Sequence, residues 1–148
     1  MKTELIIETK ALSELEPAPY NPRTISSDAL AGLRGSVERF GLVEPVVWNR
    51  RTGHVVGGHQ RLKVLAAMGE TETQVVVVDL PEAEEKALNV ALNNPSIAGE
   101  FTPELHRLLA EIEATMPELS SLLRFDDLAE QTKHLLAELS PNEGLTAA

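Results

Sequence analysis

The sequence contains no cysteine, which excludes disulfide bonds, thiolate metal sites and cysteine nucleophiles. Aromatic residues make up only 3% of the chain, so valine, leucine, isoleucine and alanine must build the core. No apolar run approaches the roughly 20 residues that cross a bilayer, and no transmembrane helix is expected. The first residues lack the apolar stretch and the cleavage pattern of a signal peptide, so we expect a cytoplasmic protein.

Basic residues are scarce as well. The 148 residues include 13 Lys and Arg against 23 Asp and Glu, which gives a formal net charge of −10. This balance argues against nonspecific coating of nucleic acid. The charges are unevenly distributed, because residues 1–70 hold 9 basic and 8 acidic side chains, whereas residues 71–148 hold 4 and 15. An anionic ligand is therefore expected to bind in the first half.

The hydrophobic pattern predicts an α/β (α+β) fold with a small mixed sheet, followed by helices. The expected strands lie at 3–9, 45–49, 54–57 and 74–78, of which the second and third form a hairpin. The expected helices lie at 28–40 (capped by Ser26 or Ser27), 59–68, from Pro81 in the first turn to about 93, 103–115 and 127–139 (capped by Asp126). A stiff proline-rich loop without regular structure is expected at 17–23, and a connector at 94–99. We expect three parts: a domain at 1–95, a helical appendage at 96–140 and a frayed tail at 141–148.

The most informative stretch is Val55-Val56-Gly57-Gly58-His59-Gln60-Arg61, where a strand ends in two glycines and a helix begins. Glycines let backbone N–H groups approach a ligand, and a helix start leaves N–H donors unpaired. Such a junction suits a phosphate, sulfate or carboxylate, and Arg61 could add a bidentate contact. By themselves the two glycines are better explained by a tight turn, since neither a Walker loop nor Gly-x-Gly-x-x-Gly is present.

Two further segments could converge on this junction. Tyr20-Asn21-Pro22-Arg23 presents an amide and a guanidinium from a stiff loop, and the chain from Phe40 to Pro45 could line a pocket wall. Residues 20–63 hold seven basic and three acidic side chains, although a solvated surface explains several of them equally well.

The histidines and one acidic run complete the set of candidate groups. His54 and His59 flank the glycine turn and could both face the site. For His59, a hydrogen bond to phosphate or a structural role is favoured over a role as general acid or base. His106 and His134 lack a zinc-ligand pattern and are expected at the surface. The acidic run of Glu82, Glu84 and Glu85 is expected on a solvated helix face.

Three stretches, in this order and spacing, resemble the boxes of the ParB/sulfiredoxin superfamily, and residues 10–95 look like a ParB-like N-terminal domain. They are Asn21-Pro22-Arg23, Gly41-Leu42-Val43-Glu44-Pro45-Val46-Val47 and Gly58-His59-Gln60-Arg61. The third box reads Gly-Glu-Arg-Arg in many ParB proteins and Gly-Cys-His-Arg in sulfiredoxins. The ending around Ala91-Leu92-Asn93 resembles versions from phages, plasmids and DNA modification methylases.

The resemblance implies a nucleotide site for CTP or ATP, with or without Mg²⁺. The nucleotide-binding residues it implies are Asn21, Arg23, Gly57, Gly58, His59, Gln60 and Arg61, with His59 as the catalytic candidate. The missing cysteine excludes sulfinate repair. Leu92 precedes Asn93 where ParB proteins usually place a Glu, so no metal site is expected unless Asn93 contributes to one.

The leading hypothesis is a nucleotide-binding module that serves DNA processing or partition in a phage, a plasmid or another mobile element. The alternatives are a phosphotransferase or weak nucleotide hydrolase, and an interaction module that has lost its ligand. DNA contact is expected through a DNA-processing partner or a separate DNA-binding subunit, because the acidic helices after residue 100 are unsuited to reading a DNA sequence. No membrane partner is expected, and homodimer formation is left open.

Overall fold

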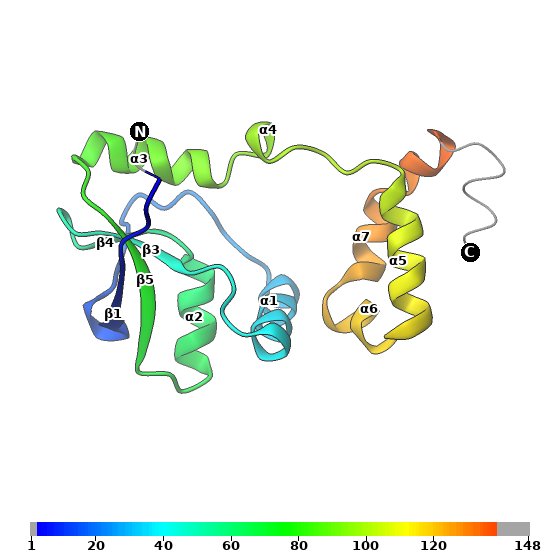
Figure 1. Cartoon of the computed structure of the whole chain (residues 1–148), viewed down its shortest axis with the longest axis horizontal. Helices are drawn as coiled ribbons and strands as arrows, with labels where there is room; N and C mark the ends of the chain where they lie inside the picture. The colour runs from blue at the N-terminus through cyan, green and yellow to red at the C-terminus, as the bar shows by residue number, and fades with distance from the viewer. Residues whose placement is uncertain (1–2, 139–148) are drawn as a thin grey trace. The chain divides into compact units, whose positions relative to one another are not determined.

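The computed structural model describes residues 3–138, which form parts of two compact units, Met1–Ala98 and Gly99–Ala148. The first unit is built on a five-stranded sheet of order β1-β5-β3-β4-β2 (Figure 1). Its strands are β1 (Ile7–Ala11), β2 (Glu16–Pro17), β3 (Val46–Asn49), β4 (His54–Gly57) and β5 (Glu72–Val78). The β1–β5 and β3–β4 pairs are antiparallel, whereas the β3–β5 and β2–β4 pairs are parallel. The predicted mixed α/β fold is confirmed.

Helices complete the first unit. They are α1 (Ser27–Phe40), α2 (His59–Ala67), α3 (Glu82–Leu92) and the short α4 (Pro95–Ala98), with a 3₁₀ turn at Leu12–Glu14. Helices α1 and α2 pack together through Val37, Val64 and Leu65 (Figure 1). A second apolar cluster holds the sheet together through buried valines of β3, β4 and β5. As expected from the few aromatics, aliphatic side chains dominate this core.

Ser26 is the residue that caps α1. Its hydroxyl accepts a hydrogen bond from the Ala29 N–H at 3.1 Å, which satisfies one of the unpaired donors of the first turn. The helix ends at Gly41, which adopts a φ of 81°. One of the two expected caps is therefore confirmed, and so is the expected end of the helix.

Several boundaries in the first unit differ from expectation. β1 begins at Ile7 rather than at residue 3. It extends to Ala11 because β5 starts at Glu72, which pairs with Ala11. The proline-rich loop contains regular structure after all, since Glu16 and Pro17 pair with β4. This pairing is possible because β2 is an edge strand, where the missing proline N–H costs nothing. Pro81 lies one position before α3 as its N-cap, and α4 occupies most of the expected connector.

The second unit is helical within its described residues, 99–138. It contains α5 (Glu104–Thr115), α6 (Glu118–Leu122), α7 (Phe125–Gln131) and a 3₁₀ segment at Lys133–Glu138. The single helix expected at 127–139 is wrong, because Arg124 adopts a φ of 59° before α7 begins and Thr132 ends it. No described helix is long and apolar enough to cross a membrane.

His106 does not lie free at the surface. Its Nε2 donates to the Thr132 carbonyl at 2.8 Å, so it ties α5 to the end of α7, whereas His134 is exposed as expected. The tail expected at 141–148 lies outside the described residues. The domain limits expected at residues 95 and 140 stay predictions.

Candidate anion-binding site

The turn between β4 and α2 is built around Gly58. This residue caps α2 in the left-handed conformation, with a φ of 87°. A Cβ atom here would lie 3.1 Å from the Cα atom of Val46, so a side chain would meet both backbone strain and a rigid neighbour. The tight turn delivers the chain directly from a buried strand into the first turn of α2, whose N–H donors carry a partial positive charge.

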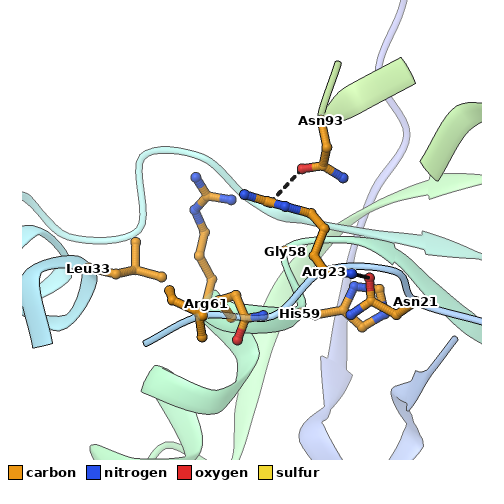
Figure 2. A pocket seen from close by; sticks show the side chains of 9 residues that line it. Asn21, Arg23, Leu33, Gly58, His59, Arg61 and Asn93 are labelled. Atoms are coloured by element: carbon orange, nitrogen blue, oxygen red, sulfur yellow. Dashed lines mark hydrogen bonds between the residues drawn. The ribbon is translucent and has the colours of Figure 1, made fainter. Parts of the chain in front are cut away.

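A pocket of about 240 Å³ opens beside this turn (Figure 2). Its described lining consists of Asn21, Arg23, Ile25, Leu33, Gly58, His59, Gln60, Arg61 and Asn93. None of these nine side chains is acidic, and two of them are arginines. Figure 2 shows both guanidinium groups at the same end of the pocket. Such an arrangement favours an anion, because fixed positive charges of like sign are best compensated by a negative group between them.

Arg23 reaches the pocket from the proline-rich loop and is held there by α3. Its Nη1 donates to Asn93 Oδ1 at 2.6 Å, and Asn93 Nδ2 donates to the Asn89 carbonyl at 2.9 Å (Figure 2). Asn89 is 1% exposed, and its amide donates to the Val56 carbonyl of β4 at 2.9 Å. A chain of amide contacts therefore connects the sheet, α3 and the guanidinium of Arg23.

Arg61 lies in the first turn of α2, and its guanidinium forms an ion pair with Glu44. The Arg61 side chain is 29% exposed, whereas that of Glu44 is 72% exposed. Glu44 belongs to the loop from Gly41 to Pro45 that leads from α1 into β3. None of residues 40–45 belongs to the described lining, so this loop does not form the expected pocket wall and meets the pocket through the ion pair of Glu44 with Arg61.

His59 serves as a hydrogen-bond acceptor for the proline-rich loop. Its Nε2 accepts the Ala18 N–H at 3.1 Å, so the proton of the neutral ring lies on Nδ1. Burial, with additional repulsion from Lys63 and Arg23, lowers the pKa of His59 below its ordinary value. The imidazole is therefore neutral at pH 7, and one of its nitrogens is occupied by the backbone.

Gln60 and Gly57 behave differently from each other. The Oε1 atom of Gln60 is buried and has no hydrogen-bond partner within residues 3–138. Gly57 is absent from the described lining, and a Cβ atom on it would lie 3.0 Å from Leu92 Cδ1 of α3. The structure thus brings together six of the seven expected ligand-binding residues, and Gly57 instead allows α3 to pack on β4.

His54 and Glu85 do not occupy the places expected for them. Glu85 is 0% exposed and lies within hydrogen-bond distance of four side chains, so the expected solvated face is wrong at this position. The donors are the Tyr20 hydroxyl at 2.5 Å, the Asn49 amide at 2.7 Å, the Thr52 hydroxyl and His54 Nδ1 at 3.0 Å. His54 therefore contacts Glu85 and is not part of the pocket lining.

The donors around Glu85 determine its protonation state. Burial alone would raise the pKa of its carboxyl, but the four hydrogen bonds outweigh burial and lower the pKa to about 2. Burial and the same carboxylate raise the pKa of the Tyr20 hydroxyl above its ordinary value. Glu85 thus fixes α3, the β3–β4 hairpin and the loop before Asn21 to one another.

Sequence reasoning missed this carboxylate because its surroundings come from distant segments. The only local signal is the four-residue spacing of Glu85 and Asn89, which places both on one face of α3. Polar residues on one helix face are normally assigned to solvent, and nothing in the sequence shows that this face is turned inward.

The described residues offer little to a metal ion. Within residues 3–138, no group of three His, Asp or Glu side chains is arranged to hold one. Asn93, the one expected contributor, already accepts a hydrogen bond from the Arg23 cation through its Oδ1 atom. These residues do not fit a Mg²⁺ site held by the protein, since Mg²⁺ favours charged oxygen ligands.

Comparisons with known proteins agree on one family. The sequence profile of the ParB N-terminal domain matches residues 2–94. A probable chromosome-partitioning protein ParB of Campylobacter jejuni is 23% identical over 150 residues, covering 90% of this chain and 54% of that protein. The chain thus spans about half the length of this relative. A ParB-like nuclease domain-containing protein of Escherichia coli K12, YnaK, is 30% identical over 86 residues, which cover 58% of this chain and 98% of that protein.

Solved structures show the same fold. The C-terminally truncated chromosome-partitioning protein ParB of Caulobacter crescentus, crystallised with CTP-gamma-S, has a TM-score of 0.62 at 16% identity, covering 79% of this chain and 70% of that one. A Pnob8-like ParB N-domain has a TM-score of 0.52 at 15% identity, covering 89% of this chain and 51% of that one. At these identities the likeness establishes the fold alone.

Proposed function

Because the chain belongs to the ParB N-terminal domain family, whose members include chromosome-partitioning proteins, we propose that its pocket at the start of α2 binds a nucleoside triphosphate, CTP or ATP. The phosphates lie against the backbone N–H groups that follow Gly58 and contact the guanidinium groups of Arg61 and Arg23. Asn21 and Gln60 contribute polar contacts from the lining.

The observation that carries this proposal is that two arginines and the N-terminus of α2, which has no side-chain cap, line one pocket. Two cations from separate segments, Arg23 and Arg61, end beside the first turn of α2, and no lining side chain is acidic. Helix N-termini and bidentate arginine side chains both hold phosphate groups well in proteins. That the Caulobacter relative is crystallised with CTP-gamma-S supports a nucleotide as the source of that phosphate.

The buried oxygen of Gln60 supports a nucleotide over a simple anion. This acceptor has no partner within the described chain, and a buried acceptor without a donor is costly. A sulfate ion or the internal phosphates of a nucleotide are fully ionised and offer no proton for it. A ribose hydroxyl or an exocyclic amine does, so a nucleotide could satisfy both the arginines and Gln60.

The geometry lends less support to catalysis than to binding. His59, the residue expected to act as an acid or base, is neutral at pH 7 and uses Nε2 to hold the Ala18 N–H. We assign it to positioning the loop that carries Asn21 and Arg23. A phosphotransferase or hydrolase activity would need another base, whereas nucleotide binding needs none.

The biological setting we propose is DNA partition or processing with partners, in a mobile element such as a phage or plasmid. The second unit carries three basic against nine acidic side chains over residues 99–138, which favours contact with DNA through a partner or a separate DNA-binding subunit. The Caulobacter protein has also been crystallised with its centromeric parS site, which supports DNA partition as the setting of this proposal.

The experiment that tests nucleotide binding is calorimetric titration of CTP, ATP and GTP, with and without Mg²⁺, beside a thermal-shift assay. We expect Arg61→Ala to weaken binding about tenfold to a hundredfold, because a charge-assisted contact contributes about 1.5–3 kcal/mol. Arg50→Ala is the matched control, since Arg50 pairs with Glu8 and does not line the pocket. Absence of binding by the folded parent protein would leave the interaction module without a ligand as the better description.

A further inference from the structure

Arg61 is already neutralised by the chain itself. Its guanidinium pairs with the carboxylate of Glu44. This carboxylate therefore binds the same group of Arg61 that a ligand phosphate would bind. Glu44 is not among the lining residues and reaches Arg61 from the loop before β3. A carboxylate beside the pocket therefore competes with a ligand for one of its two arginines.

The competitor is held loosely. The Glu44 side chain is 72% exposed, and its carboxylate pairs with the Arg61 guanidinium. Ion pairs of this exposure are weak, so a phosphate group can displace the carboxylate. After displacement the carboxylate stays on a short loop bounded by Gly41 and Pro45, where its charge still repels a bound anion.

We propose that Glu44 is a specificity-determining residue of this pocket, which lowers its affinity for phosphate ligands in proportion to their charge. The inference rests on the proposed nucleotide site and predicts the direction of one change in affinity: removing the Glu44 charge strengthens nucleotide binding. A triphosphate gains more from that removal than a monophosphate, because repulsion grows with the charge brought near the carboxylate.

The test compares the parent protein with Glu44→Gln in calorimetric titrations of CTP, ATP and the matching monophosphates. We expect Glu44→Gln to bind the triphosphates about 3-fold to 30-fold more tightly, with a smaller gain for the monophosphates. Glu8→Gln is the matched control, because Glu8 also forms an exposed ion pair with an arginine, Arg50, that does not line the pocket. It removes the same charge and should leave the dissociation constant unchanged.

A double mutant separates competition for Arg61 from a general change of charge. In an Arg61→Ala background the ion pair is gone, so Glu44→Gln should strengthen binding only by relieving the remaining repulsion, and by less than in the parent. A gain in the single variant that persists in full in this background would overturn the competition for Arg61. Circular dichroism and melting temperatures confirm that each variant is folded.

The outcomes distinguish this inference from the proposed function. If the parent binds triphosphates and Glu44→Gln binds them equally or more weakly, Glu44 is not a competitor and the nucleotide site still stands. If neither folded protein binds any of the nucleotides, both ideas fail together. Triphosphate binding by the parent that Glu44→Gln strengthens supports both.

Discussion

Replacing the buried carboxylate of Glu85 should destabilise the whole first unit. In Glu85→Gln, an amide group would have to face a site filled with hydrogen-bond donors, including Tyr20 and Asn49. Four bonds to a charged acceptor contribute about 6–12 kcal/mol in total, at about 1.5–3 kcal/mol each. Burying the carboxylate costs several kcal/mol, so the expected loss of unfolding free energy is about 3–5 kcal/mol, as for a broken buried ion pair.

The assay is urea denaturation of the full chain, followed by circular dichroism at pH 7. Glu84→Gln is the matched control, since Glu84 is the adjacent residue of α3 and is exposed. We expect the control to change the free energy of unfolding by less than about 0.5 kcal/mol. A Glu85→Gln protein within about 1 kcal/mol of the parent would refute the argument that its hydrogen bonds outweigh burial.

The pH dependence of stability gives an independent check. The pKa of Glu85 falls from 4.5 to about 2 on folding, so the folded state favours the ionised form. Its contribution is complete above pH 4.5 and is lost as the pH falls from 4.5 towards 2. The shift corresponds to roughly 3 kcal/mol, at the lower end of the loss expected for Glu85→Gln. The parent should lose more stability than Glu85→Gln across this interval, and parallel curves would contradict the assignment.

Two further predictions follow from the turn at Gly58 and from the acidic second unit. Gly58→Ala should lower the unfolding free energy by more than Gly69→Ala. Both glycines have a positive φ, but of the two only Gly58 would place a Cβ atom within 4 Å of other atoms. Equal losses of unfolding free energy in urea denaturation would contradict this. The isolated chain should show no sequence preference for DNA in anisotropy titrations near physiological salt; tight binding to one duplex, retained as salt is raised, would show that the helices after residue 100 read DNA.

The site could be predicted from the sequence as far as its chemistry is local. Pro22 stiffens the loop that carries Arg23, and the two glycines before His59 mark the end of a strand and the start of a helix. Six of the seven expected residues line one pocket because these two segments are positioned by β2 and β4, which pair with each other. The helix at 127–139 failed for a related reason, since a left-handed Arg124 and a hydrogen bond between His106 and Thr132 are invisible to hydrophobic periodicity.

The contacts that arrange the site are the part that periodicity could not supply. Glu85 and Asn89 lie on an α3 face that propensity assigns to solvent, yet both are buried, because Asn49 and the Val56 carbonyl meet them from the sheet. These partners change the roles expected for His54 and for the arginines. His54 becomes a donor to a structural carboxylate, and the phosphate-binding role falls on the arginines, whose positions depend on that buried polar framework.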